Sequence, residues 1–300
     1  MKFAILITTK NRLNDLIFTI ESLNHLLQKG DVECIICDDG SEDGTFDYIS
    51  IHYPTIQLFR NKISKGLIYS RNKLLERTSA EFAISIDDDS FFITKNPLEL
   101  IENYFDNNSN CGLIAFRIFW GKTLPEIIET DEKPNLVRGF VGCGHVWRMT
   151  SWKSISPYPE WFIFYGEEDF ASYELFKQKI EIHYLPTVLV QHNVDVLSRK
   201  NNIDYRLRQR RSFRSGWYLY FLFCPWKVIP RKLIYTLWIQ IKSKTLKGDF
   251  KATIGVLQAV GDVVINFPKL LKKSNRFSSK EYSNYLELPP TKLYWNPKKS

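Results

Sequence analysis

The sequence predicts an α/β fold, with a mainly parallel sheet flanked by helices and a basic, aromatic helical extension at its C-terminal end. Through the first hundred residues, short apolar runs alternate with segments of helical spacing, an order typical of parallel sheets with right-handed crossovers. The two parts of the chain also differ in net charge. Residues 196–300 hold 22 Lys and Arg against 5 Asp and Glu, whereas residues 1–195 carry a net charge of −9. With 300 residues, 44% of them hydrophobic, the chain can form one large domain and an appendage.

The individual elements follow from the spacing of apolar residues. In the first half we expect strands at Phe3–Thr8, Val32–Cys37, Ile56–Phe59 and Phe82–Ile86. We expect helices between and after them at Leu13–Leu27, Thr45–Ser50, Gly66–Arg77 and Pro97–Phe105. The second half is less regular, with expected strands at Leu113–Trp120, Leu136–Gly142, Glu181–Tyr184 and Val188–Gln191 and a helix at Glu168–Lys177.

Two features of composition bear on the compartment. The opening apolar run predicts a buried strand rather than a signal peptide. The five cysteines have neither the spacing of a disulfide framework nor a second pair to complete a zinc site. Cys34 and Cys37 fall in one expected strand, where they point to opposite faces. We therefore expect reduced, buried cysteines in a cytosolic protein.

Three consecutive carboxylates, Asp87, Asp88 and Asp89, end the expected strand Phe82–Ile86. Like charges this close are unfavourable unless a cation neutralises them. A divalent metal with oxygen ligands, often shared with a phosphate, is the usual neutraliser. A solvated acidic turn before the helix at Pro97 is the structural alternative.

Other polar segments fall at the same edge of the predicted sheet. Residues 8–12 and 38–41 also follow strands, and ligands of parallel sheets bind at the carboxyl ends of strands. An Asp in residues 38–41 can hydrogen-bond a nucleobase or ribose, or can simply form a tight turn. Arg71, on an expected helix, can pair with a diphosphate or a cleft acid, or can be an ordinary solvated arginine.

Two later segments are compatible with catalysis. Glu167, Glu168 and Asp169 follow the aromatic stretch Trp161–Tyr165. A carboxylate walled by aromatic rings can act as a general base, although acids also favour a helix N-terminus. His192 ends an apolar run and can be a metal ligand beside the Asp cluster, or an ordinary satisfied histidine.

Taken in order, these segments resemble the family 2 glycosyltransferases, a large inverting family with the A-type nucleotide-sugar-binding fold, here of the bacterial cell-surface polysaccharide type. The resemblance spans roughly residues 3–195. It rests on Thr8-Thr9-Lys10-Asn11-Arg12, residues 38–45 (DDGSEDGT), Asn61 with Gly66 and Arg71-Asn72, the Asp cluster at 87–89, Gly142-Cys143-Gly144, residues 166–169 (GEED) and His192.

The resemblance implies a role for each matching residue. Donor-binding residues would be Thr8, Asn11, Arg12, Asp39, Asn61, Arg71, Asp87, Asp88 and Gly142. Thr8 and Asp39 would contact the nucleobase, with Asp39 accepting from a ring N–H, and Arg71 would hold the donor near its sugar or diphosphate. Asp87 would bind ribose or sugar. Asp89, with His192, would bind a divalent metal, Mn²⁺ or Mg²⁺.

The resemblance implies that the general base would lie in residues 166–169, where this chain departs from many relatives. They carry a Glu-Asp pair directly after the glycine, whereas this chain has Glu167-Glu168-Asp169. An ungapped reading makes Glu168 the base, and a shift of one residue makes it Asp169, which we favour slightly. Many relatives also carry a basic residue several positions later, where this chain has Glu174.

The resemblance implies a metal-dependent inverting glycosyltransferase. Residues 1–198 would transfer a hexosyl or deoxyhexosyl group from a nucleoside-diphosphate sugar, UDP-sugar favoured, to a glycan or lipid-linked acceptor in cell-surface polysaccharide synthesis. A nucleotidyltransferase on a similar sheet is an alternative, but residues 8–12 lack the glycine of its phosphate loop. A non-catalytic membrane-associated protein with a vestigial site is another.

Residues 199–300 form the basic region, in which an arginine run precedes the aromatic stretch Trp217–Phe223. Aromatic residues beside Lys and Arg suit a segment that lies in the membrane interface. We therefore expect a protein bound peripherally to the anionic inner face of the cell membrane. A helical subdomain that packs on the body or forms a homo-oligomer is the alternative, and we expect no nucleic-acid partner.

Overall fold

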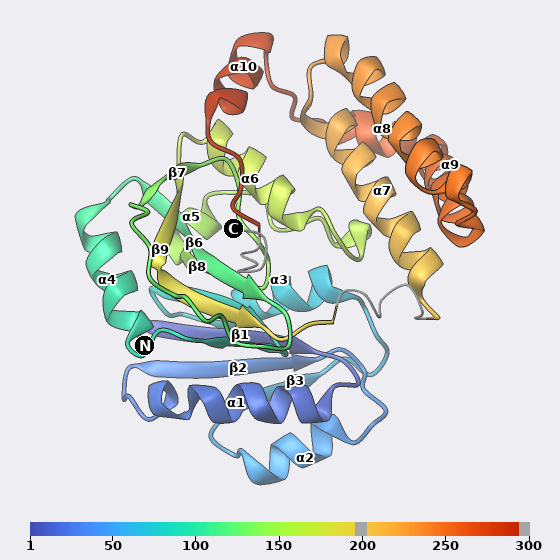
Figure 1. The fold of residues 1–300 in the computed structure, drawn as a ribbon. Helices are drawn as coiled ribbons and strands as arrows, with labels where there is room; N and C mark the ends of the chain where they lie inside the picture. Colours follow the sequence, from blue (N-terminus) through green and yellow to red (C-terminus); the bar gives the residue numbers. More distant parts are fainter. Residues whose placement is uncertain (196–202, 294–300) are drawn as a thin grey trace.

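The structure, a computed structural model, describes residues 1–195 and 203–293 and is built on a nine-stranded mixed sheet covered by helices on both faces (Figure 1). Eight strands follow the order β3-β2-β1-β4-β8-β6-β9-β5, and β7 pairs with β9. The strands are β1 (Phe3–Thr9), β2 (Val32–Asp38), β3 (Gln57–Arg60), β4 (Phe82–Asp87), β5 (Ser90–Phe92), β6 (Cys111–Trp120), β7 (Asn135–Val137), β8 (Gly144–Arg148) and β9 (Glu181–His192).

Helices connect and cover these strands. Those of the body are α1 (Leu13–Leu27), α2 (Thr45–His52), α3 (Leu67–Arg77), α4 (Pro97–Asn107), α5 (Met149–Lys153) and α6 (Glu167–Lys177). Those of the C-terminal region are α7 (Tyr205–Phe223), α8 (Ile229–Ser243), α9 (Phe250–Lys272) and α10 (Ser279–Glu287). The α/β class and the C-terminal helices are as the sequence predicts.

The parallel half of the sheet brings the expected polar segments to one edge. β1 pairs in parallel with both β2 and β4, so that Thr9 lies opposite Asp38 and Thr8 lies opposite Asp87. The three strands therefore end side by side. The prediction that the Asp cluster and the segment after β2 share one edge is confirmed.

Alternation along β1 divides the core into two layers, as expected for a strand buried on both faces. Ala4 and Leu6 belong to the cluster that contains α3, α6 and α7, whereas Phe3, Ile5 and Ile7 belong to the cluster that contains α1 and α4. The cysteines follow the same rule. All five are free and buried, and Cys34 and Cys37 lie in opposite layers.

The second half of the sheet differs from the prediction. The expected strand Leu136–Gly142 shrinks to the short β7, and the next strand is β8, which runs antiparallel between β4 and β6. The two strands expected after residue 180 are a single strand, β9. Its pairing with β6 shifts register between Leu185 and Leu189, and this irregularity accommodates Pro186, which cannot donate to the ladder.

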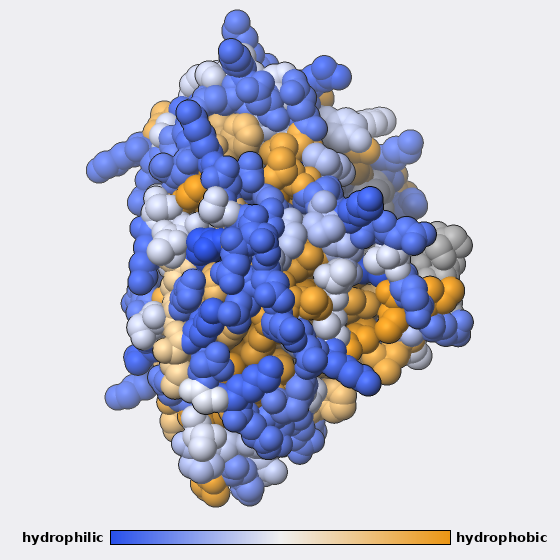
Figure 2. All heavy atoms as spheres, turned by 90° about the vertical axis from the view of Figure 1, so that its left-hand side faces the viewer, coloured by the Kyte–Doolittle hydropathy of each residue, from blue (hydrophilic) through white to orange (hydrophobic). Residues whose placement is uncertain are grey.

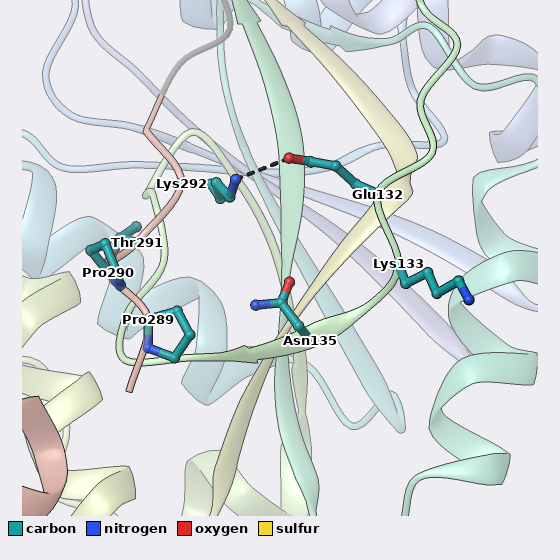
Figure 3. Close-up of a pocket in the computed structure, with 7 residues that line it drawn as sticks. All are labelled: Glu132, Lys133, Asn135, Pro289, Pro290, Thr291 and Lys292. Atoms are coloured by element: carbon teal, nitrogen blue, oxygen red, sulfur yellow. Dashed lines mark hydrogen bonds and ion pairs between the residues drawn. The ribbon is translucent and has the colours of Figure 1, made fainter. Parts of the chain in front are cut away.

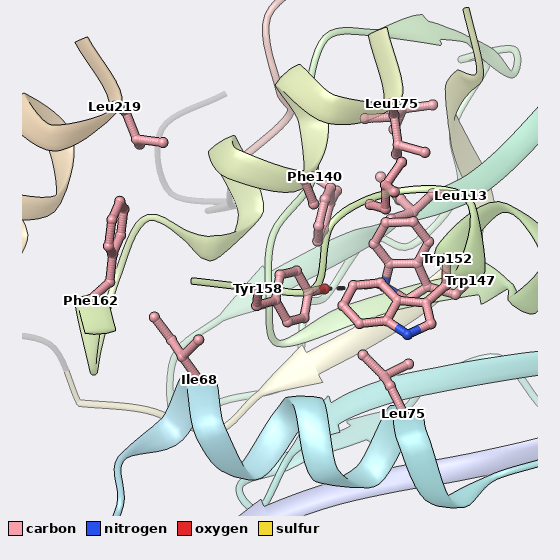
Figure 4. Packing of buried hydrophobic residues seen from close by; sticks show 14 of the residues in the cluster. Ile68, Leu75, Leu113, Phe140, Trp147, Trp152, Tyr158, Phe162, Leu175 and Leu219 are labelled. Carbon is pink, nitrogen blue, oxygen red and sulfur yellow. Dashed lines mark hydrogen bonds between the residues drawn. The ribbon is translucent and has the colours of Figure 1, made fainter. Parts of the chain in front are cut away.

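The C-terminal region shares a hydrophobic cluster with the body. Ile68 and Leu75 of α3, Trp147 of β8 and Leu175 of α6 pack in one cluster with Leu219 of α7 (Figure 4). The cluster continues to residues of α9 and α10. The boundary expected at residue 198 lies outside the described residues, and the two parts on either side of it form a continuous core.

The chain returns to the body after α10. Residues 289–292 run beside the segment 132–135, where Lys292 Nζ donates to Glu132 Oε1 at 2.9 Å (Figure 3). A cavity of about 430 Å³ lies between the two segments. The return of the chain ties the C-terminal region to the body at a second place.

Candidate active site

A cavity of about 690 Å³ opens at the carboxyl ends of β1, β2 and β4. Its walls come from these strand ends, from the start of α3, from the end of β9 and from α7. Eight of the residues predicted for the site line it, namely Thr8, Asn11, Arg12, Asp39, Asp87, Asp88, Asp89 and His192. The other five, Asn61, Arg71, Gly142, Glu168 and Asp169, do not line it.

Arg12 neutralises two members of the Asp cluster. Its Nη1 donates to Asp88 Oδ1 at 2.8 Å and to Asp89 Oδ2 at 2.7 Å, and Thr9 Oγ1 donates to the other oxygen of Asp88. Burial raises the pKa of Asp88 to about 7 despite this pairing. Arg12 thus pairs with the protein's own carboxylates while its side chain, 41% exposed, lines the cavity, and its contact with the donor stays a prediction.

His192 completes the charge balance of the cluster. Its Nε2 lies 3.1 Å from Asp89 Oδ1 and 4.0 Å from Asp87 Oδ2. Burial opposes both charges, but the ion pair outweighs it. The contacts with His192 and Arg12 lower the pKa of Asp89 to about 2, while Cys143 and Asp89 raise that of His192 to about 11.

These residues fit a divalent cation. The ligand atoms of Asp87, Cys143 and His192 all lie within 4.8 Å of one another. Magnesium and manganese favour carboxylate oxygen and imidazole over the soft sulfur of a thiol. Asp87 and His192 are thus the members of this group that suit such an ion, and Asp89, the other ligand that the sequence predicts beside His192, lies 3.1 Å from His192 Nε2.

Arg71 lies beneath the cavity rather than in it. Its guanidinium, 5% exposed, donates to Glu167 Oε1 at 2.6 Å, to Asp87 Oδ1 at 2.8 Å and to the carbonyl of Gly142 at 3.1 Å. In this arrangement the protein's own groups occupy Arg71, and its contact with the donor stays a prediction. Arg71 links the end of β4 to the start of α6.

Glu168 and Asp169 separate in space because neighbouring residues of a helix point about 100° apart. A Cβ placed on Gly142 would lie 2.6 Å from Glu168 Oε1 and 2.6 Å from Arg71 Nη1, so Glu168 belongs to the Arg71 cluster. Asp169 is exposed on α6 and makes none of these contacts. This placement is in favour of the ungapped reading, and the identity of the base stays a prediction.

Asp39 organises the loop before α3. Its two oxygens accept four hydrogen bonds, from Asn61 Nδ2, Ser64 Oγ and the backbone N–H groups of Lys65 and Gly66, at 2.6–2.9 Å. A nucleobase N–H would have to compete with these donors. Asp39 lines the cavity and Asn61 supports it from outside the lining, and the contact of Asp39 with the base stays a prediction.

Asn11 fastens the loop after β1 to the loop after β2. Its side-chain oxygen accepts from the backbone N–H of Glu42 at 2.7 Å, and its own backbone N–H donates to Ser41 Oγ at 2.9 Å.

Glu174, where many relatives carry a basic residue, is buried and accepts from Asn275 Nδ2 at 3.0 Å. It holds the C-terminal segment and does not face the cavity.

Three charged residues of the site are absent from the prediction. Glu167 pairs with Arg71, and Arg208 and Arg211 of α7 line the cavity. The two arginines share a helix face with Asp204, at spacings of four and three residues, and this periodicity is visible in the sequence. The sequence predicts an anionic surface as the partner of the whole arginine run, whereas Arg208 and Arg211 line the cavity.

Comparison with known proteins agrees with this geometry. The model of the family "Glycosyl transferase family 2" matches residues 4–146. An uncharacterized glycosyltransferase of Bacillus subtilis (strain 168), YfnE, is 29% identical over 124 residues, which are 40% of this chain and 31% of that protein. The chain thus matches under a third of this curated relative.

Solved structures resemble the fold at low sequence identity. GalNAc-T7, solved with UDP, GalNAc and Mn²⁺, matches 74% of this chain and 48% of its own with a TM-score of 0.57 and 14% identity. A mannosyltransferase of Pyrobaculum calidifontis, solved with GDP-Man and Mn²⁺, matches 95% and 78%, with a TM-score of 0.55 and 11% identity. S. aureus TarS 1-349, in complex with UDP-GlcNAc, matches 73% and 67%, with a TM-score of 0.52 and 16% identity.

The order of motifs, the cavity at the strand ends and the matching family model lead to one assignment. The fold is the A-type glycosyltransferase fold, and residues 4–146 match the model of glycosyl transferase family 2.

Proposed function

We propose that the chain is a metal-dependent inverting glycosyltransferase that moves a sugar from a nucleoside-diphosphate sugar to an acceptor hydroxyl. One observation carries the proposal. Asp87 and Asp89 face the same cavity as His192, and Arg71 joins Asp87 to the carboxylates that begin α6. The site thus combines residues suited to a cation and a diphosphate with a candidate base at one end.

The relatives support a nucleoside-diphosphate sugar as donor. GalNAc-T7 was solved with UDP and TarS with UDP-GlcNAc, while the archaeal mannosyltransferase was solved with GDP-Man. Two of these three structures contain Mn²⁺. We favour a UDP-sugar, with Thr8 at the nucleobase end of the cavity and the loop ordered by Asp39 as its wall.

The base in this proposal is Glu168. Its carboxylate accepts the proton of the acceptor hydroxyl while that oxygen bonds to the anomeric carbon. The bond from this carbon to the diphosphate breaks on the opposite side, which inverts the configuration. Arg71 pairs with Glu167, the residue before Glu168, and with Asp87 at the end of β4, so the start of α6 keeps a fixed relation to the Asp cluster. A bound Mn²⁺ or Mg²⁺ would stabilise the charge of the departing diphosphate.

The acceptor side of the proposal rests on the apolar face of α8 and α9. Large side chains there are exposed, among them Ile234 (69%), Trp238 (56%), Leu257 (66%), Val264 (68%) and Ile265 (78%). By length and composition α9 could cross a membrane, and 28% of its apolar window is buried. By contrast, mainly hydrophilic residues cover the side of the molecule that carries α4 (Figure 2).

We propose that this face lies on the anionic inner surface of the cell membrane, where the chain would glycosylate a lipid-linked or glycan acceptor in cell-surface polysaccharide synthesis. Lys242, Lys247, Lys251 and Lys272 lie on or beside the two helices. Lys and Arg near an anionic surface add about 1 kcal/mol each to binding. A second copy would bring the same basic region, and like charges would repel, so charge favours the membrane over a homo-oligomer.

Release of nucleoside diphosphate tests the transferase proposal. Purified protein is incubated with a panel of UDP-, GDP- and dTDP-sugars, with Mn²⁺, Mg²⁺ or a chelator, and free diphosphate is measured. We expect metal-dependent release from one donor class, most readily from a UDP-sugar. A folded protein that releases none of them, with or without short-chain lipid-linked acceptors, would count against the proposal.

Vesicle flotation tests the membrane proposal separately. The protein should bind vesicles that contain anionic phosphatidylglycerol and should not bind pure phosphatidylcholine vesicles. Trp238→Ser with Leu257→Ser should abolish binding, whereas Ile51→Ser, an exposed apolar residue of α2, should leave it unchanged. Equal binding by both variants would show that the α8–α9 face is not the contact.

A further inference from the structure

The arginines of α7 differ in how the protein uses them. Arg210 Nε donates to Asp262 Oδ2 of α9 at 2.7 Å, and Arg214, 8% exposed, also approaches Asp262 and donates to the carbonyl of Phe162. These two arginines hold α7 against α9 and against the body. Their role is structural, and it accounts for only part of the arginine run.

Of the three other arginines of this helix, Arg206 is exposed outside the cavity, whereas two turn toward it. Arg208 and Arg211 line it together with the Asp cluster and His192. Arg208 Nε donates to Asp204 Oδ2 at 2.6 Å, and its Cζ lies 5.7 Å from the ring centroid of Phe164, which also lines the cavity. Arg211 makes no hydrogen bond or ion pair within residues 1–195 and 203–293.

The electrostatic surroundings of Arg211 are those of an unsatisfied cation. Partial burial, and then the charge of Arg214, lower its pKa. Arg208 and Arg210 add to this repulsion, and Asp204 offsets it only in part while paired with Arg208. A half-buried guanidinium without a partner is costly unless a ligand supplies an anion.

The same cavity is lined by the residues suited to a metal and a diphosphate. The cavity therefore has carboxylates at the strand ends and a cationic wall on α7. The planar guanidinium presents donors in a fork that matches phosphate oxygens. A phosphate group between the two walls would satisfy Arg211 without disturbing the pairs that Arg12 and His192 already make.

We propose that Arg211, supported by Arg208, binds a phosphate group of a substrate, so that the C-terminal region completes the substrate site of the catalytic domain. This inference rests on the proposed transferase function, because that function supplies the substrate that carries the phosphate. Two sources share this chemistry. One is the diphosphate of the donor, and the other is the phosphate of a lipid-linked acceptor.

The test measures binding by calorimetry to the full chain and to Arg211→Gln. The probes are inorganic pyrophosphate, UDP, GDP and uridine, each with Mn²⁺, and pyrophosphate again with the protein saturated by UDP. Arg206→Gln, which removes an exposed arginine of the same helix outside the cavity, is the matched control. Losing one charge-assisted contact should weaken binding of a phosphate-bearing probe about tenfold or more.

The pattern of loss identifies the source. Weaker UDP or GDP binding with no change for uridine would assign Arg211 to the donor diphosphate. A loss confined to pyrophosphate binding in the presence of UDP would assign it to the acceptor. Arg206→Gln should match the wild type in every titration, and Arg211→Gln should melt at the same temperature or higher, because it relieves repulsion from Arg214 without removing a partner.

Two results would overturn the inference. One is that Arg211→Gln binds every phosphate probe as tightly as the wild type. The other is that the wild type binds none of them. Pyrophosphate requires no knowledge of the donor. The wild type could bind pyrophosphate through Arg211 and yet release no diphosphate from any sugar donor. That pair of results would contradict the transferase proposal and support phosphate binding by Arg211.

Discussion

Arg71 Nη1 lies 2.6 Å from Glu167 Oε1, and both side chains are buried. This pair joins α3 to α6 at the point where α6 begins, one residue before Glu168. Burial raises the pKa of Glu167, with a further contribution from Glu168, while Arg71 opposes the change. The pair therefore fixes the position of the carboxylate that we propose as base.

Breaking this pair from one side should destabilise the fold. Arg71→Met leaves the buried carboxylate of Glu167 and that of Asp87 without their cation, and we expect a loss of about 3–5 kcal/mol in the free energy of unfolding. Arg71→Met with Glu167→Gln should lose less. Urea unfolding followed by circular dichroism measures both, and a single variant as stable as the wild type would contradict this role.

The identity of the base gives a second prediction. Glu168→Gln should lower kcat by about 10²–10⁴-fold with little change in the KM for the donor. Asp169→Asn is the matched control, because it removes a neighbouring carboxyl that is exposed and outside the Arg71 cluster. Initial rates of diphosphate release report both. The reverse pattern would restore the reading that places the base one residue later.

A third prediction concerns Gly142, where the structure leaves no space for a side chain. A Cβ there would lie 2.6 Å from both Glu168 Oε1 and Arg71 Nη1. Gly142→Ala should therefore push Glu168 aside and lower kcat more than tenfold. Gly30→Ala, where a Cβ meets nothing within 4 Å, should retain full activity. An active Gly142→Ala would show that Glu168 need not stay in this position.

The sequence predicts the first half of the fold well because the periodic signals there are strong. The start of β1 and the whole of α1 lie where the apolar spacing places them. In the second half, β8 is only five residues long and begins at Gly144 after a Gly-Cys pair, so a turn is the natural reading. The local signal at Pro186 likewise suggests two strands, whereas pairing with β6 imposes one.

The sequence predicts which residues gather at the site better than it predicts which of them contact one another. Sequence order places the Asp cluster and His192 at one edge, and the structure brings them together. The order of residues in the sequence does not reveal which charged side chains form ion pairs with one another. Arg12 and Arg71 are expected to contact a ligand, yet both pair with carboxylates of the protein, because distances across strands depend on tertiary packing.

A pH dependence follows from His145, which is 1% exposed on β8. Burial, and then the charge of Arg71, lower its pKa from 6.5 to about 3. Between these two pKa values the imidazole is protonated in the unfolded chain and neutral in the folded protein. The free energy of unfolding therefore falls as pH decreases from about 6.5 toward 3, by up to about 1.4 kcal/mol per pH unit.

His145→Asn should flatten this part of the stability curve. Denaturant unfolding at several pH values between 4 and 7 measures the slope for the variant and the wild type. His25→Asn, which changes an exposed histidine of α1, should leave the slope as it is. Identical slopes for the wild type and His145→Asn would contradict a neutral, buried imidazole.

The most direct test of the central claim is calorimetric titration of the wild type and Asp87→Asn with UDP and GDP, each in Mn²⁺ and in a chelator. We predict that one nucleotide binds the wild type in Mn²⁺, that the chelator weakens binding by at least tenfold, and that Asp87→Asn loses this metal dependence. Binding that is equal with metal and chelator, or absent for every nucleotide with folded protein, would contradict a metal-dependent nucleotide-sugar site at the ends of β1 and β4.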